Sequence, residues 1–69
     1  MKPIKDYQNH IVCYGDTKTG MLESKYKKQT TKTYLAIGAE FTITRDTTET
    51  VIKRISNAAF KVHSYPIAV

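Results

Sequence analysis

Residues 35–45 read LAIGAEFTITR, and the alternation within this stretch decides the fold class. From Leu35 to Ile43 every second side chain is apolar, and the positions between them carry small or polar side chains. A period of two is typical of a strand with one buried face, and Gly38 favours a bend or bulge of the kind that a small barrel needs. The predicted buried face consists of Leu35, Ile37, Ala39, Phe41 and Ile43.

Short segments on both sides of this stretch also favour strands. The chain has ten threonines and five tyrosines, and β-branched and aromatic side chains suit a pleated, half-buried surface. Polar turn residues separate the segments at 16–20, at 46–49 and at Ser56–Asn57, while residues 28–32 are expected to form a polar connection. The additional strands are predicted at 10–15, 21–28, 50–55 and 58–65.

The segment 50–55 is the least regular of these. Val51 and Ile55 share a parity, but Lys53 lies between them and Ile52 points the other way. A bulge, or burial on both sides near one end, would explain this pattern. The same region is the best helix candidate, although no window shows the apolar spacing of a long amphipathic helix. We therefore expect an all-β, β-rich domain of five short antiparallel strands with little or no helix, either a small barrel or a strongly bent sheet.

The run Ile37-Gly38-Ala39-Glu40-Phe41-Thr42-Ile43, followed by two further strands that end in Phe60-Lys61-Val62-His63, resembles the meander of SH3-like barrels. The resemblance covers roughly half of the chain. It implies a fold and no functional residues, because many unrelated functions occur on such barrels.

Length and composition limit the classes of function. With 69 residues, the chain is expected to form one small domain over residues 1–69, whose limited core weighs against an enzyme with a deep cleft. A single cysteine excludes an intramolecular disulfide. No apolar run suits a signal peptide or a membrane span, so we expect a soluble, cytoplasmic protein without membrane contact.

The residues that catalysis or metal binding requires are few. Cys13 has no recognisable nucleophile motif around it and is expected to be a small buried side chain. His10, Cys13 and His63 are fewer ligands than a closed zinc site requires. There is no phosphate-binding glycine motif and no suggestive pair of carboxylates. The predictions are therefore no catalytic residues, no metal, no cofactor and no enzyme activity.

Charge and aromatic residues point to binding instead. The formal net charge is +5, which favours polyanionic partners but is also ordinary for the solubility of a small domain. Several lysines and rings share the parity predicted to face outward, and lysines that meet phosphates beside rings that stack on bases are typical of single-strand binders. The candidate binding residues are Lys25, Lys27, Lys32, Tyr34, Lys61, His63 and Tyr65.

Two functions remain open from the sequence. The first is a small nucleic-acid-binding accessory protein that uses this lysine and tyrosine face. The alternative is a small regulator or inhibitor that docks on a partner protein, of the type found in phages and mobile elements, with an acidic surface as the favoured partner. The composition suits an AT-rich bacterial or phage genome. Either a monomer or a homodimer is compatible with the sequence.

Overall fold

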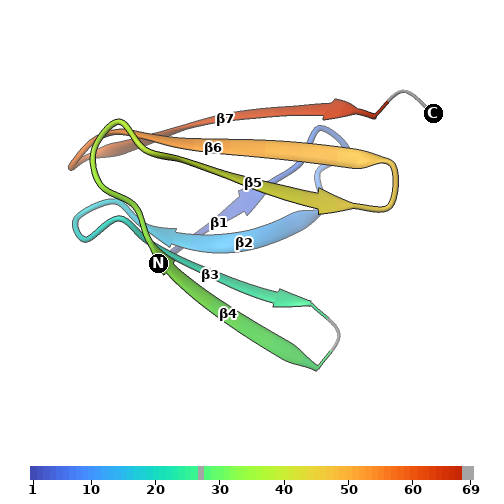
Figure 1. Ribbon diagram of the computed structural model, residues 1–69, viewed down its shortest axis with the longest axis horizontal. Coiled ribbons are helices and arrows are strands. Elements are labelled where there is room, and N and C mark those ends of the chain that lie inside the picture. The colour runs from blue at the N-terminus through green and yellow to red at the C-terminus, as the bar shows by residue number, and fades with distance from the viewer. Residues whose placement is uncertain (27, 68–69) are drawn as a thin grey trace.

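The computed structural model of the protein describes residues 1–26 and 28–67. These residues form seven strands and no helix, arranged in two antiparallel sheets of order β1–β2–β3–β4 and β5–β6–β7 (Figure 1). The strands are β1 (Lys2–Lys5), β2 (Ile11–Asp16), β3 (Met21–Tyr26), β4 (Gln29–Tyr34), β5 (Glu40–Arg45), β6 (Thr48–Ser56) and β7 (Ala59–Pro66).

The all-β prediction is confirmed, but the count of five strands is wrong and no closed barrel forms in the described part of the chain. The two strands that the sequence analysis missed are β1 and β4. Three of the four β1 residues are exposed, and every β4 residue except Thr33 is exposed. Neither strand therefore shows the alternation of apolar and polar side chains that marks a buried face.

The predicted strand over residues 35–45 begins only at Glu40. Gly38 has a φ of 92°, a left-handed conformation that suits glycine, and it turns the chain before β5 rather than bending a continuous strand. Ile37 sits in this turn and is 60% exposed, so its predicted burial is wrong. Leu35 is buried as predicted, and Phe41 and Ile43 pack against the core from β5.

β6 is a strand and not a helix, and its residues alternate more regularly than the sequence suggested. Its buried positions are Thr48, Thr50, Ile52 and Arg54, so three of the four inward side chains are polar. The register between β6 and β7 shifts between Arg54 and Ser56, which is the bulge expected as one explanation of the irregular pattern. The preceding loop is shorter than predicted, because Arg45 already pairs with Thr48.

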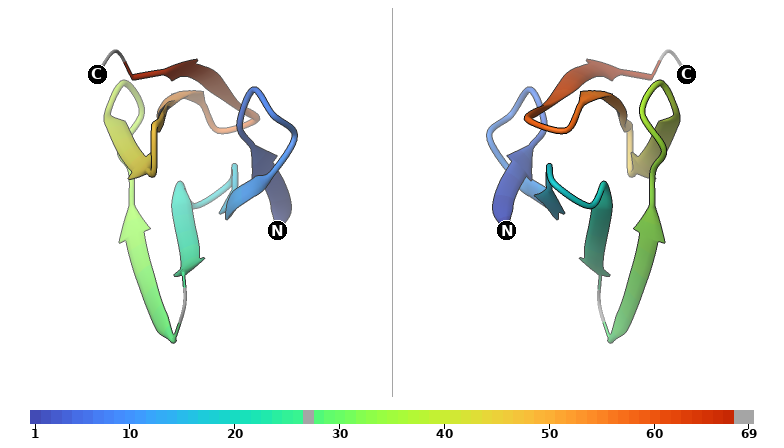
Figure 2. Two further views of the ribbon diagram at one scale, coloured as in Figure 1. Left: turned by 90° about the vertical axis from the view of Figure 1, so that its right-hand side faces the viewer. Right: turned by 90° about the vertical axis from the view of Figure 1, so that its left-hand side faces the viewer.

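The hydrophobic core lies between the two sheets, which are stacked as two layers (Figure 2). Gly15 allows the layers to approach, because a Cβ atom at this position would lie 2.8 Å from the Phe60 ring and 2.9 Å from the Ile4 side chain. A larger side chain at Gly15 would force the sheets apart. The buried core residues are Ile4, Val12, Cys13, Leu22, Leu35 and Ile52.

Both arginines of the chain connect segments of the two sheets. Arg54, on β6, donates from Nη1 to the Leu35 carbonyl at 2.9 Å and from Nη2 to the carbonyls of Thr17 and Lys18 at 3.1 and 2.9 Å. Arg45, on β5, donates from Nη2 to the Val12 carbonyl of β2 at 2.8 Å. Apart from His10 and His63, the exposed basic side chains among the described residues are lysines.

Candidate functional site

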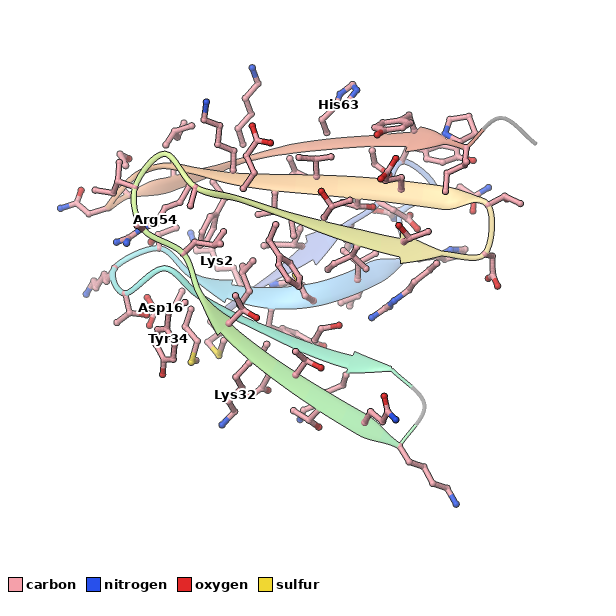
Figure 3. The ribbon with its side chains drawn as sticks, viewed as in Figure 1. Lys2, Asp16, Lys32, Tyr34, Arg54 and His63 are labelled. Carbon is pink, nitrogen blue, oxygen red and sulfur yellow. The ribbon has the colours of Figure 1, made fainter. Side chains whose placement is uncertain are left out.

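The structure divides the predicted binding residues between two surfaces. Lys25, Lys32 and Tyr34 lie on the β3–β4 hairpin of the first sheet. Lys61, His63 and Tyr65 lie on β7 in the second sheet, and Figure 3 shows His63 on the side of the molecule opposite to Lys32 and Tyr34. These side chains therefore do not form one continuous patch. Lys27, the remaining predicted residue, lies outside the described residues.

The first surface is the outer side of the β3–β4 hairpin, which extends away from the rest of the molecule (Figure 2). We call it the ribbon face and define it by Met21, Glu23 and Lys25 of β3 and by Lys32 and Tyr34 of β4. The register places Glu23 opposite Lys32 and Met21 opposite Tyr34. These side chains share one face because directly opposed residues of an antiparallel pair lie on the same side of the sheet.

A single carboxylate serves both lysines of the ribbon face. Glu23 Oε1 lies 3.7 Å from Lys25 Nζ, and Glu23 Oε2 lies 3.6 Å from Lys32 Nζ. Both ammonium groups are well exposed, so each ion pair contributes little to stability, ~0–1 kcal/mol for pairs of this kind. The arrangement holds two positive charges on the same side of the hairpin while leaving both accessible to another anion.

Exposed rings lie beside these charges. Tyr34 is 68% exposed at the base of the hairpin, and Tyr14, which is opposite Glu23 on β2, is 37% exposed. Lys28, an exposed residue between β3 and β4 that the sequence analysis assigned to a polar connection, adds a further positive charge. Residues 1–34 contain seven lysines and three acidic residues, so most of the surplus charge lies in the half of the chain that forms the first sheet.

The second surface is a groove of about 580 Å³ on the outer side of the β5–β6–β7 sheet. Lys53 and Lys61 are directly opposed on neighbouring strands, and Glu40 lies on the other side of Lys53. Lys53 was not predicted, because the sequence did not show which β6 residues face outward. Glu40 and Glu49 on this face match the two lysines in number, so the β7 groove has no surplus of positive charge. It is lined by Glu40, Val51, Lys53, Lys61, Val62, His63 and Tyr65.

Tyr65 is held in place at the end of this groove. Its hydroxyl donates to Glu49 Oε2 at 2.5 Å, and its ring centre lies 5.2 Å from that of His63. The hydrogen bond to Glu49, and then burial and the negative charge of Glu49, raise the pKa of the Tyr65 phenol above its ordinary value. The Tyr65 hydroxyl is therefore fixed by its hydrogen bond to Glu49, whereas the Tyr34 hydroxyl makes no hydrogen bond to any described residue.

The residues considered for catalysis or metal binding lie apart. His10 is exposed before β2 and its Nδ1 lies 3.8 Å from Asp6, His63 is exposed on β7, and Cys13 is buried at 1% exposure. Burial raises the pKa of the Cys13 thiol to about 11, with the Arg45 charge opposing part of that shift. The predicted burial of Cys13 is confirmed. Within residues 1–26 and 28–67, no group of three His, Cys, Asp or Glu side chains is placed to hold a metal ion.

No family model, curated protein or solved structure matches the chain. The described residues include no helix with the length and apolar character needed to cross a membrane. On the geometry alone, the ribbon face offers exposed ammonium groups beside a free phenol ring, and the β7 groove offers two opposed lysines balanced by carboxylates. Of the two, the ribbon face has the chemistry suited to a polyanion.

Proposed function

We propose that the protein is a non-enzymatic accessory protein that binds single-stranded nucleic acid through the ribbon face. The observation that carries this proposal is the position of Lys25, Lys32 and the exposed Tyr34 ring on one side of a projecting hairpin. A hairpin that stands away from the body of the protein reaches a nucleic acid strand without obstruction from the second sheet.

Electrostatics supports phosphate binding at this face. Each Nζ–Oε distance to Glu23 exceeds 3.5 Å, longer than a charge-assisted hydrogen bond of about 2.7–2.9 Å. A phosphate oxygen that approaches either ammonium group displaces only a weak contact. Binding would then release counterions from the nucleic acid, and the affinity would fall steeply as the salt concentration rises.

The rings supply the remaining part of the mechanism. A base stacked on an exposed aromatic side chain contributes about 1–3 kcal/mol and shows little sequence preference. Tyr34 is free to serve as this platform because no hydrogen bond to a described residue holds its hydroxyl. Tyr14, on the same outer face, offers a second ring. This combination suits an unpaired strand, whose bases are available for stacking, better than a duplex.

The test is a titration of a fluorescein-labelled 12-nucleotide single strand, as DNA and as RNA, at 50 and 200 mM salt. We expect log K to fall linearly with log salt and the double variant Lys25→Glu/Lys32→Glu to lose measurable binding. Glu23→Gln should bind more tightly because a repelling carboxylate is removed. The control Lys53→Glu/Lys61→Glu makes the same change of charge in the β7 groove and should retain most of the affinity.

Equal losses in the two double variants would show that net charge, and not the ribbon face, determines binding. Absence of binding at 50 mM salt would refute the function itself. A protein-docking function is the second candidate, and one specific feature favours it: the outer edge of β4 pairs with no other strand among residues 1–26 and 28–67.

A further inference from the structure

We infer that the free edge of β4 binds an extended acidic segment of a partner protein, which adds to the first sheet as a fifth strand. This inference concerns the backbone of β4 and does not depend on nucleic-acid binding by the ribbon face. It rests on the pattern of backbone hydrogen bonds in the hairpin, on the condition of the other sheet edges and on the charge around β4.

The hydrogen-bond pattern shows which backbone groups of β4 point outward. Leu35 donates its N–H to the Gly20 carbonyl at 2.8 Å, and this pair continues the register of β3 and β4. Residues of an antiparallel pair alternate between facing the partner strand and facing away from it. Gln29, Thr31 and Thr33 therefore bond to β3. The N–H and C=O groups of Thr30, Lys32 and Tyr34 point away from β3, and β4 is the last strand of its sheet.

The other sheet edges are less suited to strand addition. β1 contains Pro3, which has no N–H, and its register shifts between Ile4 and Lys5. β7 ends at Pro66. β5 is regular, but Arg45 at its end reaches across to backbone carbonyls of β2. By contrast, β4 is six residues long, contains no proline and keeps an unbroken register with β3.

The hairpin would also gain stability from another strand. Its far end extends beyond the second sheet (Figure 2), and every β4 residue except Thr33 is exposed. Two-stranded ribbons are marginally stable in water, whereas three or more strands support one another. The threonine-rich sequence of β4 suits pairing with a further strand.

The charge around β4 indicates which kind of strand would pair with its free edge. Lys25, Lys28 and Lys32 lie on or next to the hairpin with Glu23 as their one acidic neighbour on the ribbon face. A second copy of β4 would bring a second Lys32 to the same edge, and directly opposed like charges are unfavourable. An acidic residue in the added strand opposite Lys32 would instead form a favourable cross-strand pair, worth about 0.2–1 kcal/mol. The fitting partner is therefore an extended segment with glutamate or aspartate at alternate positions.

The test is an NMR titration of the ¹⁵N-labelled protein with an eight-residue peptide that alternates glutamate with valine or threonine. We expect the largest shifts, together with slower amide exchange, at Thr30 and Lys32. Thr30→Pro removes one outward N–H without breaking a bond to β3 and should weaken peptide binding at least tenfold. The matched control Thr30→Ala keeps the N–H and should bind as the original protein does.

A second form of the test leaves the protein unchanged. The same peptide with N-methyl groups at alternate residues cannot complete the ladder and should fail to bind, as should a peptide with lysine in place of glutamate. Equal binding of the methylated peptide, or shifts confined to the β7 groove, would overturn the inference. So would slow exchange of the Thr30 and Lys32 amides in a dimer of the free chain, because the occupant would then be a second copy. Thr30→Pro should retain nucleic-acid binding, so a loss of one activity is separable from a loss of the other.

Discussion

Replacing Arg54 by methionine should remove a large part of the stability of the fold. The substitution keeps a long side chain but removes three hydrogen bonds to backbone carbonyls in a position that is only 9% exposed. A hydrogen bond to a charged group contributes about 1.5–3 kcal/mol, and such contributions are not additive. Burying the charge has an opposing cost, and Arg54 Nε is a buried donor without a partner among the described residues. We expect a net loss of about 3–4 kcal/mol.

This loss is large for a chain of 69 residues, whose total stability is expected to be roughly 3–10 kcal/mol. Equilibrium urea unfolding followed by far-UV circular dichroism measures it directly, and the midpoint should fall sharply without a change in slope. Arg54→Lys should be intermediate, because an ammonium group cannot span the same carbonyls. The control Lys53→Met removes the neighbouring outward charge and should change stability by less than about 0.5 kcal/mol. A loss below about 1 kcal/mol for Arg54→Met would refute the reasoning.

Three further predictions concern single positions. Gly20→Ala should destabilise the protein by more than about 2 kcal/mol, because Gly20 has a φ of 80° and an added Cβ would lie 2.1 Å from the Leu35 carbonyl oxygen. A thermal unfolding midpoint within about 3 °C of that of the original protein would contradict this prediction. In the folded protein at pH 8, Cys13 should not react with a thiol-directed disulfide reagent, because a pKa of about 11 leaves the buried thiol protonated. The same thiol should react in 8 M urea, and rapid reaction of the folded protein would disprove the burial of Cys13. Glu49→Gln should lower the raised pKa of the Tyr65 phenol, as followed by the NMR shift of its ring, and an unchanged titration would exclude the hydrogen bond as the cause. Because the folded-state pKa of Tyr65 is raised, the stabilisation from its hydrogen bond to Glu49 is complete below about pH 10 and is lost as the pH rises through the folded-state pKa. The difference in unfolding free energy between the original protein and Glu49→Gln should therefore close only in that alkaline range.

Hydrophobic alternation predicted the fold where the buried face is apolar and failed where it is polar. Phe41 and Ile43 of β5 were assigned correctly, because apolar and polar side chains alternate along that strand. β6 buries Thr50 and Arg54 beside Ile52, and a hydropathy pattern cannot distinguish such polar residues from outward ones. The Thr50 hydroxyl and the two Nη atoms of Arg54 bond to partners distant in sequence, as in the 3.1 Å contact between the hydroxyl oxygens of Thr50 and Ser64.

The candidate site was predictable only in part, for a related reason. Parity within a strand placed Lys25, Lys32 and Lys61 on outward faces, and the structure shows all three exposed. Parity does not show which strands are neighbours, so the division between two sheets could not be foreseen. β4 was missed because its side chains bury almost nothing, and a strand held mainly by its backbone ladder leaves no hydrophobic pattern in the sequence.

Both arginines donate hydrogen bonds that connect the two sheets, whereas the lysines lie on the surface. The groups that hold the fold together are therefore chemically different from the charged groups that face solvent. All eight described lysines keep contact with solvent, and none of their ammonium groups forms an ion pair that joins the two sheets. Acylation of lysine amines removes their charge, whereas a guanidinium group resists the same reagents. Stepwise acetylation of the lysines, by an enzyme or a reagent, would therefore remove the positive surface charge of the protein while the arginine hydrogen bonds and the fold stay intact.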